Sequence, residues 1–160
     1  MNKIEKLEKI LDLQLGWVRA ADTRLTLTLP LATAMLTVLA ALAPEPTNWN
    51  ILPAITCSIS AIIVLLSIVF SYFAFFPRTQ GPKGSFVFFG GIAAREAEQY
   101  RKSILDLTED EYMTDLSNQC HRNAQIASQK YAWAQRSLAA LLIAILPWLI
   151  SIYLLYNTSS

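Results

Sequence analysis

The sequence predicts an all-α membrane protein in which three transmembrane helices continue as long helices into a cytoplasmic helical region. Its 160 residues are 54% hydrophobic and only 16% charged, whereas a soluble domain carries about 25% charged residues. The shortage of charge is concentrated in three windows without any charged residue, 25–43, 51–76 and 138–156. A bilayer core needs roughly 20 apolar residues in helical conformation, so each window is long enough to form a span.

The basic residues predict the orientation of these spans. All 13 Lys and Arg residues lie in residues 1–24 or 77–137, which fall on one side of a chain that crosses the membrane three times. Basic residues mark the cytoplasmic side of a membrane protein. We therefore expect a multi-pass topology with the N-terminus and residues 77–137 in the cytoplasm and the C-terminus outside it.

The first element is an N-terminal cytoplasmic helix, residues 1–24, that continues into the first span, residues 25–43. Apolar residues recur at helical spacing from Ile4 onwards, and no Gly-Pro break separates the two parts. The alternative is an amphipathic helix that lies flat on the membrane. The polar face carries charges of both signs, which favours the upright helix. The sequence thus predicts one helix from about residue 3 to residue 43.

The second span, residues 51–76, follows a short turn in which Pro44 and Pro46 end the first helix. The chain then enters the cytoplasmic region 77–137. Near its start, "FVFFGG" reads as an extended segment, and we expect a helix to begin after Gly90-Gly91 and to run through "IAAREAEQYRKSILDL".

A longer helix is predicted to begin at Thr108. The sequence T-E-D-E forms a capping box, with Thr108 as the N-cap and Glu111 at the third helical position. Apolar or small residues then recur every three or four positions up to Leu138. We therefore expect one helix from about residue 109 to residue 156, which includes the third span, residues 138–156.

The apolar stripe of this helix carries several small residues, including Ala124, Ala127 and Ala134. Small residues allow helices to approach closely, so we expect the chain to form a homo-oligomer. Several copies usually assemble with closed cyclic symmetry, and we take four copies as the working number. A bundle formed within one chain is the alternative.

Three segments carry a family resemblance. They read "ADTRLTLTLPLATAMLT", "FFGGIA" and "DLSNQCHRNAQIASQKYAWAQRSL", and in this order they resemble the transmembrane effectors of bacterial Pycsar anti-phage systems. The resemblance implies a nucleotide-gated effector of the bacterial inner membrane, with the C-terminus in the periplasm. Such an effector forms an ion-conducting pore or disrupts the membrane, which causes growth arrest or cell death.

The resemblance also implies the signal. In the Pycsar type it is a cyclic pyrimidine mononucleotide made by an operon-encoded cyclase. The similar Hailong type responds to an oligodeoxynucleotide, a short single-stranded DNA made by a nucleotidyltransferase. Since "FFGG" departs from the more usual "YFGH" of the Pycsar family, both ligands stay open at this stage.

Candidate nucleotide-binding residues lie in the cytoplasmic sensor region, 77–137, and in the helix that leaves it. Arg pairs with phosphate, Asn and Gln read base edges, and Trp stacks on bases. A solvated face without a ligand is the alternative. Arg95 follows Gly90-Gly91, where a helix N-terminus would favour an anion. The candidates are Arg95, Asn118, His121, Arg122, Gln125, Gln129 and Trp133.

Candidate pore-lining residues form a polar row on the first span. Thr26, Pro30, Thr33 and Thr37 share one face of a helix, because they are spaced by three or four residues. In one interpretation copies of this face surround a pore. In the other, each hydroxyl bonds back to a carbonyl one turn earlier and the face packs against another span. A competing row on the second span contains Thr56, Ser60, Ser67 and Ser71.

Enzymatic motifs are missing from the sequence. It contains no GK[ST] phosphate loop, no HExxH and no GxSxG, so we expect neither an enzyme nor a metal or cofactor site. From the spans, the small-residue stripe and the resemblance, we expect three partners: the lipid bilayer, the nucleotide signal and further copies of the chain. The alternative function is a membrane scaffold that recruits soluble partners without conducting ions.

Overall fold

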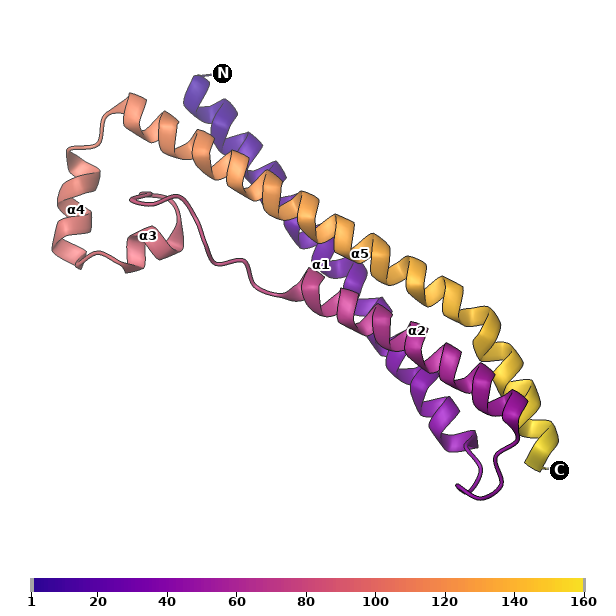
Figure 1. Cartoon of the computed structure of the whole chain (residues 1–160). Coiled ribbons are helices and arrows are strands. Elements are labelled where there is room, and N and C mark those ends of the chain that lie inside the picture. The colour runs from indigo at the N-terminus through magenta and orange to yellow at the C-terminus, as the bar shows by residue number, and fades with distance from the viewer. Residues whose placement is uncertain (1, 160) are drawn as a thin grey trace. The chain divides into compact units, whose positions relative to one another are not determined.

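The structure is a computed structural model that describes residues 2–159. Within this range the chain forms five helices, α1 (Lys3–Leu42), α2 (Ile51–Phe75), α3 (Phe89–Ala93), α4 (Ala97–Leu105) and α5 (Glu109–Ser159), and no strand (Figure 1). Three of them, α1, α2 and α5, contain stretches long and apolar enough to cross a membrane. The predicted all-α fold with three candidate spans is confirmed.

The two long helices agree with the sequence prediction. Helix α1 is continuous although it contains Pro30, and α5 is continuous although it contains Pro147. The predicted capping box starts α5: the Thr108 hydroxyl accepts a hydrogen bond from the Glu111 amide at 3.3 Å. In return, the Glu111 carboxylate accepts bonds from the Thr108 amide at 3.0 Å and from its hydroxyl at 2.7 Å. These bonds lower the pKa of Glu111 below its ordinary value.

The helix predicted after Gly90-Gly91 is wrong in its bounds. Helix α3 begins at Phe89 and contains both glycines, and the chain leaves helical conformation before α4 starts at Ala97. At the break, the Arg95 guanidinium donates to the carbonyl oxygen of Ser85 at 2.9 Å and also to that of Gly84. A Cβ at Gly91 would collide with the Ser85 carbonyl, so glycine is required there for close approach. Residues 86–88 form bends instead of the expected extended segment, because the Asp115 carboxylate accepts hydrogen bonds from two consecutive amides there.

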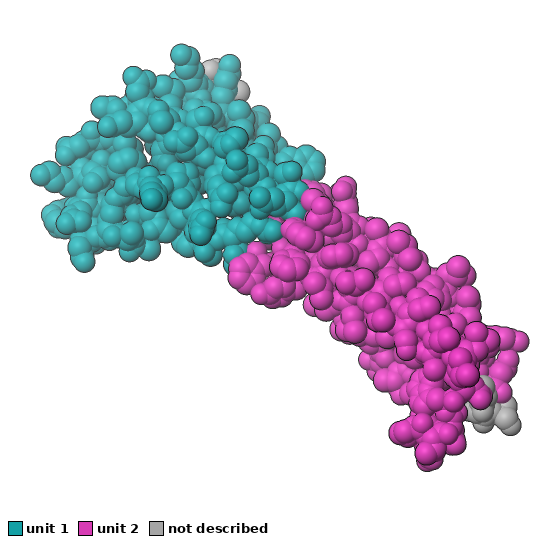
Figure 2. Space-filling model, viewed as in Figure 1, with its two compact units in different colours: residues 1–21, 77–129 teal, residues 22–76, 130–160 magenta. Residues whose placement is uncertain are grey.

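The chain divides into two compact units (Figure 2). Unit 1 contains residues 1–21 and 77–129, and unit 2 contains residues 22–76 and 130–160. Helices α1 and α5 each supply residues to both units. Unit 1 therefore holds α3, α4 and the first parts of the two long helices, and unit 2 holds α2 and their remaining parts.

Unit 2 is a three-helix bundle whose interior contains many small or polar residues, whereas most of its large apolar residues lie outside. Ser60, Ser67, Ser71, Ser137 and Ala144 are at most 1% exposed. In contrast, many leucines, isoleucines and aromatic residues face outward. A soluble protein rarely exposes so large an apolar surface, whereas helices in a bilayer pack through small residues and turn large ones to the lipid. The distribution is therefore typical of a membrane-inserted bundle.

Serine hydroxyls join α2 to α5 inside this bundle. The Ser67 hydroxyl donates to the Ser137 carbonyl, and the Ser137 hydroxyl donates to the Ser67 carbonyl, both at 2.9 Å. The Ser71 hydroxyl lies 2.8 Å from the Ser137 hydroxyl. Further along, the Trp148 indole of α5 donates to the Met35 carbonyl of α1 at 3.0 Å. These bonds fix the register of all three helices in unit 2.

Candidate functional site

Residues 77–88, which we call the strap, connect α2 to α3 and lie against α5 in unit 1. The Arg78 guanidinium donates to the Gln129 side-chain oxygen at 3.1 Å. The Arg122 guanidinium donates to the Gln80 carbonyl at 2.8 Å. Thus two side chains predicted to bind a nucleotide, those of Arg122 and Gln129, are engaged by the strap.

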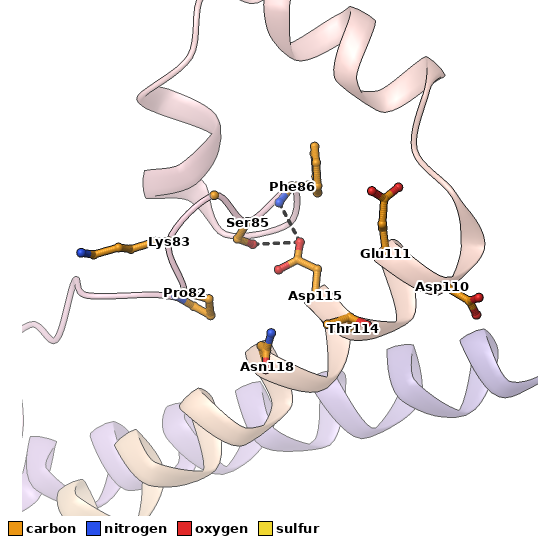
Figure 3. Close-up of a pocket in the computed structure, with 10 residues that line it drawn as sticks. Pro82, Lys83, Ser85, Phe86, Asp110, Glu111, Thr114, Asp115 and Asn118 are labelled. Atoms are coloured by element: carbon orange, nitrogen blue, oxygen red, sulfur yellow. Dashed lines mark hydrogen bonds between the residues drawn. The ribbon is translucent and has the colours of Figure 1, made fainter.

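Asp115 holds the end of the strap (Figure 3). One oxygen of its buried carboxylate accepts hydrogen bonds from the Phe86 amide at 2.7 Å, the Val87 amide at 3.2 Å and the Ser85 hydroxyl at 3.0 Å. One turn along α5, the Gln119 side-chain amide donates to the Ser85 hydroxyl at 3.0 Å. Both α5 side chains are less than 8% exposed, so these bonds are shielded from water.

The opposite side of the strap contacts the segment that follows it. The Arg95 guanidinium lies 4.6 Å from the centre of the Phe86 ring in addition to its two carbonyl bonds. The Tyr100 hydroxyl of α4 donates to the Phe86 carbonyl at 3.0 Å. Gly84 has a φ of 74°, a left-handed conformation that glycine adopts without strain. The strap is therefore held on one side by α5 and on the other by residues 95–100.

A cavity of about 370 Å³ lies between the strap and the first turns of α5 (Figure 3). Its charged lining residues are Lys83 and three acids, Asp110, Glu111 and Asp115, and Asn118 lies beside them. This excess of negative charge opposes a phosphate group. The cavity can accept an uncharged, hydrogen-bonding part of a ligand, but the electrostatics favour another place for the phosphate.

The structure brings five of the seven predicted nucleotide-binding residues together on α5 in unit 1. The Gln125 side-chain amide lies 3.0 Å from the His121 ring nitrogen, and its oxygen lies 3.4 Å from the Arg122 guanidinium. Asn118 and Gln129 flank this group on the same helix.

The other two predicted residues lie elsewhere. Arg95 is bound to the strap and lies between the end of α3 and the start of α4, so it is not one turn into a helix that begins after Gly90-Gly91. Trp133 belongs to unit 2, where its ring centre lies 5.9 Å from that of Phe70 and 5.0 Å from that of Phe73. The Arg136 guanidinium covers the same indole at 4.5 Å, so Trp133 is part of the packing between α2 and α5.

Sequence reasoning missed Ser85, Tyr100, Asp115 and Gln119. A usable signal was present for two of them: Asp115 and Gln119 are polar residues four positions apart, each directly before a member of the apolar stripe, Leu116 and Cys120. Polar side chains next to a buried stripe need partners inside the fold. The identity of those partners could not be read from the sequence.

The predicted pore-lining row has one feature of each interpretation: its hydroxyls bond back to carbonyls of α1, and it is exposed. The Thr33 hydroxyl donates to the Leu29 carbonyl at 3.1 Å and the Pro30 carbonyl at 2.9 Å, and the Thr37 hydroxyl donates to the Thr33 carbonyl at 2.9 Å. Thr26 bonds back in the same way, to the Thr23 carbonyl at 2.7 Å. Yet the row remains exposed on the bundle surface, Pro30 included. The face is thus not covered by another span of the same chain.

The competing row on α2 is used inside the bundle. Ser60, Ser67 and Ser71 are buried, and the latter two are bonded to Ser137. In a single chain, Ser67 and Ser71 hold α2 against α5, whereas the buried Ser60 hydroxyl has no hydrogen-bond partner within residues 2–159.

Two sequence segments that carry the family resemblance meet in unit 2. Asp22 and Arg24 lie in "ADTR", and Lys130 and Tyr131 lie in "QKYA". The Lys130 ammonium forms an ion pair with the Asp22 carboxylate, and the Arg24 guanidinium lies 5.1 Å from the centre of the Tyr131 ring. The two segments therefore form one structural feature between α1 and α5.

In unit 1, α1 and α5 are joined by Tyr112. Its hydroxyl donates to the Glu8 carboxylate at 3.0 Å. Burial, followed by this hydrogen bond, raises the pKa of Tyr112 above its ordinary value. Among the residues that the structure describes, no three His, Cys, Asp or Glu side chains are grouped to hold a metal ion.

Comparison with known proteins gives the family. The model of the Pycsar effector protein domain matches residues 6–157. The Pycsar effector protein PtPycTM of Propioniciclava tarda is 25% identical to this chain over 138 residues, which cover 81% of this chain and 68% of the relative. No solved structure matches the chain. Because the family match extends from the start of α1 almost to the end of α5, the chain belongs to the Pycsar effector family, as a transmembrane effector of anti-phage defence.

Proposed function

We propose that the protein is a nucleotide-gated effector of the bacterial inner membrane that permeabilises the bilayer as a homo-oligomer and so arrests the infected cell. The observation that carries the proposal is the match to the Pycsar effector domain across a chain with three candidate spans. Family membership implies a cyclic nucleotide signal from an operon-encoded cyclase. We therefore propose a cyclic pyrimidine mononucleotide as the ligand, in preference to an oligodeoxynucleotide.

The proposed sensor is the α5 face that carries Asn118, His121, Arg122, Gln125 and Gln129. A phosphate is the natural partner of the Arg122 guanidinium, since charge-assisted bonds are roughly twice as strong as neutral ones. The Gln80 carbonyl that Arg122 now binds is neutral, so a phosphate can displace it. Arg95 and Trp133 are left out of the proposed site, because each is engaged in packing elsewhere.

Release of the strap provides a direct route to the membrane spans. The strap begins at Pro77, two residues after α2 ends at Phe75. A ligand that binds Arg122 breaks its hydrogen bond to the Gln80 carbonyl. The strap, which is attached to this end of α2, is then held less firmly. The ligand gates only to the extent that it binds the released arrangement more tightly. Order–disorder changes of such segments are an established form of switching.

The proposed pore face is the threonine row of α1. This row is exposed, whereas the serines of the competing row on α2 are buried inside the bundle. Copies of α1 around a symmetry axis would bring Thr26, Pro30, Thr33 and Thr37 to the lumen, and four copies remain our working number. With Arg24, Lys130 and Arg136 at one end of unit 2 and Glu45 at the other, we place the N-terminus in the cytoplasm and the C-terminus in the periplasm.

The sensor is tested by reversing one charge. In cells that express the cognate cyclase, Arg122→Glu should abolish signal-dependent growth arrest, because a carboxylate repels the ligand phosphate. The matched control is Arg101→Glu on α4, where the arginine forms only an exposed ion pair with Glu98. Membrane fractionation should recover both variants at the wild-type level. Growth arrest by Arg122→Glu at the wild-type signal level would contradict the proposed binding face.

A further inference from the structure

A groove between α1 and α5 in unit 2 has the chemistry of a lipid site. Its volume is about 460 Å³, and its lining includes Leu27 and Leu31 of α1 and Leu138 and Leu141 of α5. Arg24 and Gln135 also line it. With Leu25, the cavity thus combines five leucines with one cationic and one amide side chain.

The polar and apolar parts of this groove are at opposite ends. Asp22 pairs with Lys130, and further along Met35 bonds to Trp148, so α1 and α5 run in the same direction. Arg24 precedes the leucines of α1, just as Gln135 precedes those of α5. One end of the groove is therefore polar, and its walls become apolar along both helices.

The groove begins where charged residues cease. Arg24 is the last charged residue before the window 25–43, and Leu138 is the first residue of the window 138–156. In an inserted bundle the polar end lies at the level of the lipid headgroups, and the leucine walls face the acyl region.

The charge of Arg24 is available to an anion. The nearest acid along the chain, Asp22, is paired with Lys130, and the other acidic residue of unit 2, Glu45, lies in the loop beyond the far end of α1. The Arg24 guanidinium rests on the Tyr131 ring, which orients it without neutralising it. Basic pockets between transmembrane helices on the cytoplasmic side are known to hold anionic lipid headgroups.

We propose that this groove binds one anionic phospholipid, with the headgroup phosphate on Arg24 and an acyl chain along Leu27, Leu31, Leu138 and Leu141. The inference depends on membrane insertion and not on nucleotide gating, so the two can fail separately. A second copy of the chain is the competing occupant, and its helix would fill the leucine walls without requiring Arg24.

The test uses the purified full-length protein in a zwitterionic detergent, with phosphatidylglycerol or phosphatidylcholine added. Native mass spectrometry counts the lipids retained by each variant. The wild-type protein should retain phosphatidylglycerol in preference to phosphatidylcholine, and Arg24→Gln should weaken that retention about fivefold, the factor that one basic residue contributes at a lipid surface. The control Arg136→Gln should retain the lipid, because Arg136 covers Trp133 and does not line the groove.

A second variant protects the test from misfolding. Leu31→Trp fills the groove and leaves Arg24 in place, so it should also lose the lipid while circular dichroism shows an unchanged helical content. Equal retention by wild type, Arg24→Gln and Leu31→Trp would overturn the proposal. A cross-linking experiment uses Leu31→Cys in a chain whose Cys57 and Cys120 are changed to serine. Disulfide-linked dimers that form without added lipid would also overturn the proposal, because they would assign the groove to a second copy.

Discussion

At the scale of single residues, the Asp115 carboxylate determines the path of the strap. Three donors converge on one of its oxygens, two of them backbone amides. An amide buried without a partner costs about 1–3 kcal/mol, so no hydrophobic residue of similar size can replace this side chain. The strap would lose its fixed position if the carboxylate were removed.

Asp115→Ala should therefore release the strap. We expect hydrogen–deuterium exchange to accelerate about tenfold at the Phe86 amide, which loses its acceptor at a cost of about 1–3 kcal/mol. The acceleration should be smaller at the Val87 amide, because this amide also donates to the Ser85 hydroxyl at 3.2 Å. Glu109→Ala is the control, since Glu109 is an exposed acid in the first turn of the same helix. If the two amides keep their wild-type protection in Asp115→Ala, the assignment of Asp115 as the anchor of the strap is wrong.

The sequence could predict the residue types of the sensor face but not their partners. Arg122, Gln125 and Gln129 follow from helical spacing alone, and the structure keeps them together on α5. Their contacts with Gln80 and Arg78 join positions about 40 to 50 residues apart and depend on the conformation of the strap. Spacing also predicts Trp133 on this face, but the sequence does not reveal Phe70 and Phe73 of α2, which pack on its ring.

At the scale of elements, the α2–α5 contact depends on Ser137. Its hydroxyl and carbonyl bond with two serines of α2 in the interior of the bundle. Hydrogen bonds between helices in a membrane contribute about 0.6–2 kcal/mol each, and serine is small enough to let the two helices approach. A larger apolar side chain loses both advantages.

Ser137→Val should accordingly destabilise the bundle by about 1–3 kcal/mol, since it removes the hydroxyl and adds bulk in a packed interior. The measurement is the midpoint of thermal unfolding in detergent micelles. Ala139→Val, which places the same side chain on the exposed face of α5, should leave the midpoint nearly unchanged. Equal midpoints for the two variants would show that the serine contact does not stabilise α2 against α5.

The elements differ in how well the sequence predicts them. Helices α1 and α5 follow from long apolar periodicity and a capping box, which are local signals. The break between α3 and α4 has no local signal, because it arises where the Arg95 guanidinium binds carbonyls about ten residues earlier. The sequence predicts a helix start after Gly91, whereas the structure needs glycine there because the Ser85 carbonyl approaches closely.

At the scale of the whole molecule, the distribution of side chains in unit 2 indicates that a lipid bilayer surrounds it. The interior contains serines and alanines beside a few larger apolar residues such as Val64 and Leu141, whereas most large apolar residues lie on the surface. The composition does not say which polar row stays exposed. The structure supplies that distinction, since the α1 threonines face outward and the α2 serines do not.

Thr33→Leu should change the ion flux if the α1 row lines a pore. The substitution replaces a hydroxyl with a larger apolar side chain, and an apolar constriction hinders hydration of the lumen. Single-channel recording in planar bilayers should show a lower conductance than wild type. Val38→Leu, at an exposed position outside the row, is the control. Wild-type currents in Thr33→Leu would assign the row to lipid or to packing between copies.

The central claim, that a cyclic nucleotide opens the membrane through this chain, is tested most directly by reconstitution. Liposomes containing the purified wild-type protein are loaded with a potential-sensitive dye, and cyclic pyrimidine mononucleotides are added one at a time. The account predicts rapid depolarisation with one of them, no response to the corresponding linear monophosphate, and no response in Arg122→Glu liposomes. Protein that is demonstrably inserted and yet gives no flux with any cyclic pyrimidine mononucleotide would contradict it.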